Sequence, residues 1–171
     1  MLKNILLGVI CLLCMATISG CQKGCANVCL RGGICLGGTC SCPDPYSGSN
    51  CDTLCLLGYE GYLCQTPSRD KFLNGWLCTS ADQSATTQTY LISFIPDTNQ
   101  LHMLMYNFNN IGGYPINCTM TGKYSFDISE PLQGTTGPFV GISGSGKLNN
   151  GKITIYILSP TNTYFATAVK Q

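Results

Sequence analysis

The sequence predicts a small disulfide-rich module followed by an all-β domain, which is an antiparallel barrel or sandwich of about eight strands. Two observations predict this fold class. Eleven of the thirteen cysteines lie within residues 1–64. After residue 64, short β-branched and aromatic runs alternate with Gly, Asn and Pro, as expected for strands joined by turns.

Residues 1–20 have the pattern of a secretory signal peptide. Lys3 lies in a short polar start, an apolar run extends from Ile5 to Ile18, and small residues follow. The run is shorter than the roughly 20 residues of a spanning helix. We therefore expect this leader to direct export and to be removed.

The tetrapeptide Ile18-Ser19-Gly20-Cys21 follows the apolar run. It resembles the lipobox of bacterial lipoproteins, and the resemblance implies that Cys21 is lipidated and begins the mature chain. Cysteine parity favours this interpretation, because ten of the thirteen cysteines then remain to pair. The alternative is an ordinary signal peptide cut nearby, as in a secreted eukaryotic protein. Lipid on Cys21 would make the membrane a partner of the protein.

The charge of the mature chain excludes one class of partner. Residues 21–171 contain eight basic and eight acidic residues, which are interspersed. Nucleic-acid binding requires a concentrated basic surface, so we expect no nucleic-acid partner.

The cysteines between residues 25 and 64 form a closely spaced array. Leu30-Arg31-Gly32-Gly33-Ile34 lies between two of them, and Cys40-Ser41-Cys42 is a tight pair. These residues resemble an EGF-like module, and a second closing loop at 55–64 is similar to laminin-type EGF modules. Spacing alone leaves the pairing open. The resemblance implies the disulfides Cys25–Cys35, Cys29–Cys40, Cys42–Cys51 and Cys55–Cys64.

Metal binding is the alternative use of these thiols, since C-x-C spacing can also chelate zinc. An exported chain favours disulfides instead. Calcium-binding EGF modules carry acidic residues before the first cysteine, where this chain has Gln22-Lys23-Gly24. We therefore expect no metal and no cofactor.

We place the EGF-like module at residues 21–66, a linker at 67–70 and the β-domain at 71–171. Cys78 and Cys118 are candidates for a further bridge inside the β-domain. The predicted strands are Phe72–Thr79, Thr87–Ile95, Leu101–Phe108, Ile116–Met120, Tyr124–Ile128, Phe139–Ser145, Lys152–Leu158 and Tyr164–Val169.

Asn150-Gly151 predicts a two-residue hairpin turn, because both positions of such a turn need positive φ. Folding the chain about this turn makes one face of the hairpin apolar and the other polar. The polar face carries Lys147, Thr154 and Tyr156, among others. On the apolar face, Leu148 is opposite Ile153, Gly146 opposite Ile155 and Gly144 opposite Ile157.

The sequence contains no recognisable catalytic motif, and we expect no enzymatic activity. The single histidine, His102, is predicted to point outward from a strand. A hydrolase would need two carboxylates in one cleft. The candidates for such a pair are Asp70, Asp82, Asp97, Asp127 and Glu130.

The segment Tyr106–Tyr114 is the best candidate for a binding loop, because Tyr, Asn and Gly together make adaptable contact surfaces. Its candidate contact residues are Tyr106, Phe108 and Tyr114. A plain hairpin connection is the alternative.

The lipobox, the EGF-like array and the β-rich remainder together resemble small lipoproteins of Bacteroidota. The resemblance implies a cell-envelope location at the outer membrane, with the side left open. We expect a non-enzymatic, lipid-anchored protein whose EGF-like stalk presents a β-domain for binding or adhesion, with a protein or glycan ligand. The alternatives are a barrel with a glycan or small ligand inside it, and a secreted eukaryotic EGF-like protein.

Overall fold

The computed structural model describes residues 24–129 and 138–171. The chain divides into two compact units, of which the first ends at Thr53 and the second begins at Leu54. The sequence-based boundary was drawn at residue 66. The loop closed by the Cys55–Cys64 disulfide therefore belongs to the second unit, with the β-domain.

The described residues of the first unit, 24–53, are held together by three disulfides, Cys25–Cys35, Cys29–Cys40 and Cys42–Cys51. With Cys55–Cys64, these are the pairings that the EGF-like resemblance implies. Strands β1 (Ile34–Leu36) and β2 (Thr39–Ser41) form a two-stranded sheet, and β3 (Tyr46–Ser47) pairs with β4 (Thr53–Leu54). Such short strands bury little apolar surface, so the disulfides supply most of the stabilisation.

The second unit begins with the Cys55–Cys64 loop. Strand β5 (Tyr59–Glu60) pairs with β6 (Thr66–Pro67), and the 3-10 helix η1 (Tyr62–Cys64) lies between them. A second 3-10 helix, η2 (Ser68–Lys71), leads into the β-domain.

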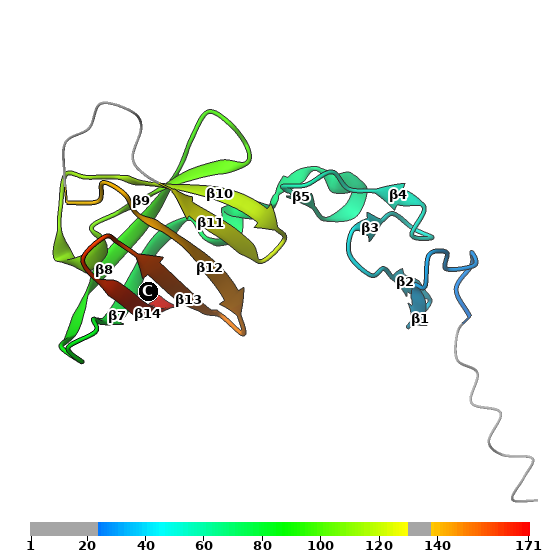
Figure 1. Ribbon diagram of the computed structural model, residues 1–171. Helices are drawn as coiled ribbons and strands as arrows, with labels where there is room; N and C mark the ends of the chain where they lie inside the picture. Colours follow the sequence, from blue (N-terminus) through cyan, green and yellow to red (C-terminus); the bar gives the residue numbers. More distant parts are fainter. Residues whose placement is uncertain (1–23, 130–137) are drawn as a thin grey trace, which may run out of the picture. The chain divides into compact units, whose positions relative to one another are not determined.

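The β-domain is an eight-stranded antiparallel closed barrel in which each strand pairs with its neighbours in the sequence and the last pairs with the first (Figure 1). The predicted strands and the barrel alternative are confirmed, with shifts of at most two residues at the strand ends, except that the strand predicted at Phe139–Ser145 lies at Ser143–Asn149. The strands are β7 (Asn74–Ala81), β8 (Thr87–Pro96), β9 (His102–Tyr106), β10 (Ile116–Gly122), β11 (Ser125–Ser129), β12 (Ser143–Asn149), β13 (Lys152–Leu158) and β14 (Thr163–Lys170).

The predicted hairpin register between β12 and β13 is also confirmed. Asn150 and Gly151 both have positive φ, and Gly146 lies opposite Ile155. The space that Gly146 leaves is filled by Phe126 from β11, its partner on the other side. A Cβ atom at Gly146 would overlap this ring, so the glycine is required for packing.

The barrel interior is filled by inward-pointing side chains. The 3-10 helix η3 (Phe108–Asn110) follows β9, whereas η2 precedes β7, so the two helices lie at opposite ends of the barrel. Phe72, just after η2, packs edge-on against Phe126, with ring centroids 5.3 Å apart. At the other end, Phe108 packs against Tyr164 at 5.8 Å. Both rings are fully buried, so each end of the barrel is closed by an aromatic side chain.

Residues 67–70, which were expected to form a linker, are instead part of the packed unit. Ser68 and Arg69 are buried. One guanidinium nitrogen of Arg69, Nη1, donates to the carbonyl oxygens of Asp97 (2.8 Å), His102 (2.6 Å) and Asn99. These bonds fix η2 to the turn between β8 and β9. Among the described residues, no helix has the length and apolarity that crossing a membrane requires.

Candidate binding face on the barrel exterior

A shallow groove lies on the outside of the barrel, over β12 and β13. Its volume is about 290 Å³, and it is lined by Ser145, Lys147, Asn149, Thr154 and Tyr156. All five residues occupy outward positions that alternate with buried or half-buried positions on the same two strands. The lining therefore combines hydroxyl, amide and ammonium groups with one aromatic ring.

A second aromatic ring lies beside this groove. Phe165 of β14 is the cross-strand partner of Tyr156, and both point outward. Tyr156 is 40% exposed and Phe165 is 55% exposed. On the other side, Asp127 of β11 is the outward cross-strand partner of Ser145. One row across four strands thus places a carboxylate, a hydroxyl and two aromatic rings side by side.

A row of threonines runs next to the aromatic pair. Thr89, Thr79, Thr167 and Thr154 are successive cross-strand partners on β8, β7, β14 and β13. The hydroxyls of Thr79 and Thr89 are 3.2 Å apart, within hydrogen-bonding distance. Neighbouring strands lie about 4.8 Å apart, so this row spans about 14 Å of polar surface.

A third row is aliphatic. Leu91, Leu77 and Val169 are cross-strand partners on β8, β7 and β14, with exposed fractions of 54%, 36% and 45%. We call the groove and the three rows together the outer binding face. Its members are Ser145, Lys147, Asn149, Thr154, Tyr156, Phe165, Asp127, Thr89, Thr79, Thr167, Leu91, Leu77 and Val169.

The predicted binding loop, Tyr106–Tyr114, supplies a core residue as well as an exposed one. Phe108 is fully buried and packs edge-on against Tyr90, with ring centroids 6.2 Å apart, so it is a core residue. Tyr106 is half-buried on β9, and only Tyr114 is exposed, at 39%. The three aromatic residues therefore do not form one exposed surface. Asn107, Asn109 and Asn110 adopt positive φ, which turns the chain so that Phe108 points inward.

The described acidic candidates for a hydrolytic pair lie in turns or at exposed positions. Asp82 and Asp97 lie just outside opposite ends of β8. Asp82 accepts hydrogen bonds from the backbone of Ser84 and Thr86, as in a turn. Hydrogen bonds from Thr98 lower the pKa of the Asp97 carboxyl. Asp70 and Asp127 are exposed, and Glu130 lies outside the described residues.

His102 lies on β9, where it is half-buried between Leu101 and the fully buried Met103. Its position agrees with the expected outward orientation. The carbonyl oxygen of His102 accepts a hydrogen bond from Arg69, so this residue contributes to the attachment of η2 through its backbone.

Cys78 and Cys118 do not form the expected bridge, and both are buried as free thiols. Cys78 is on β7 and Cys118 on β10, three strands around the barrel. That separation is about 14 Å along the sheet, whereas a disulfide needs Cα atoms within about 7 Å. Burial raises the pKa of the Cys78 thiol to about 11 and also raises the pKa of the Cys118 thiol.

The cysteine sulfurs of the first unit include one close group. Those of Cys25, Cys29 and Cys40 lie within 4.8 Å of one another. Each of these sulfurs is part of a disulfide, and zinc binds thiolates rather than disulfide sulfurs. This group is therefore explained by the two adjacent disulfides. Cys21, the expected lipidation site, lies outside the described residues.

The outer binding face was missed at the level of sequence because its residues come from six strands, β7, β8 and β11 to β14. Its signal was present in the polar face of the predicted β12–β13 hairpin, which includes Tyr156. In comparisons with family models, with curated proteins and with solved structures, the chain has no match.

Proposed function

We propose that this protein is a lipid-anchored, non-enzymatic cell-envelope protein that binds a glycan chain on the outer binding face of its barrel. The observation that carries the proposal is the exposed pair Tyr156 and Phe165 beside a polar groove. Large exposed apolar side chains rimmed by polar groups are characteristic of interaction sites.

The chemistry of this face suits a saccharide. The C–H faces of a sugar ring stack on aromatic rings, and Tyr156 and Phe165 offer two adjacent rings. Sugar hydroxyls need both donors and acceptors, which Asn149, Ser145 and Asp127 supply beside those rings. The threonine row continues the polar surface over neighbouring strands, so an extended oligosaccharide fits better than a single compact ligand.

The interior of the barrel supports this choice of the outer face. Trp76, Phe94 and Met105 are among the side chains that fill it, and each is at most 2% exposed. A ligand inside the barrel would have to displace packed core residues, at a large cost in stability. We therefore keep the glycan ligand of the alternative hypothesis, but we propose that it binds on the outside of the barrel and not inside it.

The remaining parts of the proposal follow from the sequence. Lipid on Cys21 would hold the protein at the membrane, and the disulfide-rich unit, which resembles an EGF-like module, would connect this anchor to the barrel along the chain. In the Bacteroidota lipoproteins that the chain resembles, the same arrangement of parts occurs. On this proposal, the glycan-binding barrel would be held at the outer membrane.

Two measurements test the proposal separately. Cys21→Ala in the full-length chain should release the protein from the membrane fraction and abolish acyl mass on the mature N-terminal residue. Continued membrane association of this variant would contradict lipid anchoring. Purified mature protein in detergent should bind members of a glycan array, and Tyr156→Ala should remove that binding. Binding only to proteins or peptides would contradict the glycan ligand.

A further inference from the structure

In the described part of the first unit, residues 24–53, four aliphatic side chains are exposed. Their exposed fractions are 79% for Val28, 42% for Leu30, 60% for Ile34 and 56% for Leu36. We call these four residues and Arg31 the hairpin surface, because they lie on or directly before the β1–β2 hairpin. Such a concentration of exposed aliphatic groups in a small unit is characteristic of an interaction surface.

The disulfides prevent these side chains from turning inward. Ile34 and Leu36 are alternate residues of β1 and therefore point to the same side of the hairpin. Cys35, between them, points to the other side and is bonded to Cys25. Cys29, between Val28 and Leu30, is bonded to Cys40 of β2. The exposed side chains are thus carried on a cross-linked backbone.

The charged residue of the hairpin surface is basic. Arg31 is the only charged residue between Gly24 and Pro43. Its guanidinium group lies 5.3 Å from the centre of the Tyr46 ring. A guanidinium group pairs well with phosphate, and the aliphatic neighbours suit acyl chains. Together these groups match the boundary between the phosphate headgroups and the acyl chains of a bilayer.

The proposed lipid anchor limits how far this surface can lie from a bilayer. Val28 is seven residues from Cys21, and seven extended residues span at most about 25 Å. The comparable apolar residues Leu56 and Leu57 of the Cys55–Cys64 loop lie much further along the chain, so the anchor sets no similar limit for them.

We propose that the hairpin surface lies in the headgroup–acyl boundary of the bilayer that holds the lipid of Cys21. The inference rests on the lipid anchoring in the proposed function and is independent of the glycan. The anchor then acts together with a protein surface, which would fix the orientation of the first unit on the membrane.

The experiment uses lipidated full-length protein in vesicles of phosphatidylethanolamine and phosphatidylglycerol with brominated acyl chains, which quench tryptophan. Ile34→Trp places a reporter on the hairpin surface, and Leu36→Trp is a second position in case the first fails to fold. Leu91→Trp, at a site 54% exposed on the barrel, is the matched control. The native Trp76 is 1% exposed in the barrel core and supplies a constant background.

We expect emission from Ile34→Trp to shift to the blue and to lose at least half its intensity in brominated vesicles, whereas emission from Leu91→Trp stays unchanged. Vesicle association without quenching at residue 34 or 36 would overturn the inference and leave the anchor intact. Equal quenching at residue 91 would also overturn it, since the contact would not be specific. Failure to associate with vesicles would instead reject the anchor, and the inference with it.

Discussion

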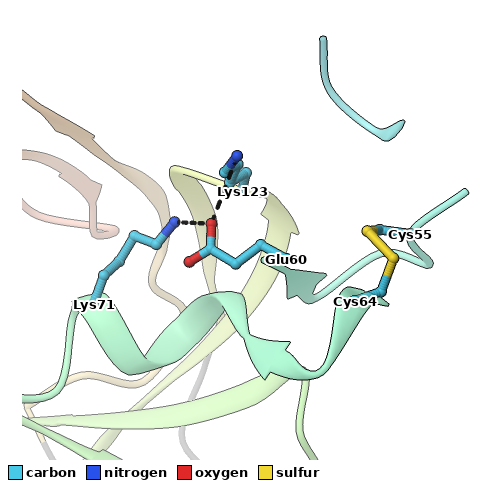
Figure 2. A network of polar contacts seen from close by, with 5 residues as sticks. All are labelled: Cys55, Glu60, Cys64, Lys71 and Lys123. Carbon is cyan, nitrogen blue, oxygen red and sulfur yellow. Dashed lines mark hydrogen bonds and ion pairs between the residues drawn. A yellow bond between two sulfur atoms is a disulfide. The ribbon is translucent and has the colours of Figure 1, made fainter. Parts of the chain in front are cut away.

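Lys71 Nζ lies 2.6 Å from Glu60 Oε2, and this ion pair joins η2 to β5 of the Cys55–Cys64 loop (Figure 2). Lys123 Nζ, from the turn between β10 and β11, lies 3.8 Å from the same oxygen. The side chains of Glu60 and Lys71 are each only 17% exposed. The loop is therefore attached to the barrel by charge as well as by the chain itself.

Replacing Glu60 with Gln should weaken this attachment. We expect the free energy of unfolding to fall by about 1 kcal/mol, since a partly exposed pair is screened by solvent. Urea denaturation at low and high salt is the measurement, and the loss should shrink at high salt. Asp70→Asn, at an exposed neighbouring position, is the control and should have no effect. An equal loss in both variants would show that the pair has no specific role.

Gly146→Ala should destabilise the barrel, because the added methyl group would overlap the Phe126 ring. Overpacking of this kind costs about 1–3 kcal/mol. Gly75→Ala is a matched control, since Gly75 is also a strand glycine but has open space where a Cβ would lie. Thermal unfolding of the two variants should separate them by several degrees. Similar melting temperatures would contradict the packing described here.

Arg69→Ala should also destabilise the second unit, by about 2–3 kcal/mol, because the hydrogen bonds that it removes involve a charged group. Three carbonyl oxygens of the β8–β9 turn lose their common donor in this variant. Hydrogen exchange should then accelerate in η2 and in that turn more than in β13. Unchanged exchange at both sites would argue that Arg69 does not hold them together.

Cys78 and Cys118 should both resist alkylation in the folded protein at pH 8. Each is buried, and desolvation raises the pKa of the Cys78 thiol to about 11 from an ordinary value of 9.0. Iodoacetamide should label both thiols after unfolding, as measured by intact mass. A folded protein that is labelled, or that is two mass units lighter through a Cys78–Cys118 bond, would contradict this assignment.

The same thiols predict a loss of stability in alkali. A thiol whose pKa is raised by folding keeps its proton to a higher pH in the folded state than in the unfolded chain. The stabilisation that results is fully present below the pKa of the unfolded thiol, which is near 9. The free energy of unfolding should then fall as the pH rises above 9. Denaturation of the double variant Cys78→Ala, Cys118→Ala should show a shallower decline.

The strands could be predicted because their alternation of apolar and polar residues is a local signal. For β13, the predicted bounds Lys152–Leu158 are those of the structure. The prediction of a linker at 67–70 was wrong because the contacts that order this segment are not local in the sequence. The partners of Arg69 lie 28 to 33 residues away, and only the fold brings them together. A polar tetrapeptide therefore looked like a linker.

The candidate site was less predictable than the fold. The sequence placed Tyr156 on a solvent-facing side, and the structure agrees. Its neighbour Phe165 depends on the register between β13 and β14, which no turn motif in the intervening segment specified. Phe108, in contrast, was expected in a binding loop because its neighbours are Asn and Tyr. The closure of the barrel buries it instead, and this is a tertiary effect.

The central claim is that the outer binding face, and not the loop near Tyr114, binds the glycan. Tyr156 and Tyr114 are a matched pair for this test, since they are 40% and 39% exposed. The measurement is calorimetric titration of detergent-solubilised wild type, Tyr156→Ala and Tyr114→Ala with the best oligosaccharide from the array. The account predicts at least a tenfold rise in Kd for Tyr156→Ala and no change for Tyr114→Ala. The reverse result, or no change in either variant, would contradict it.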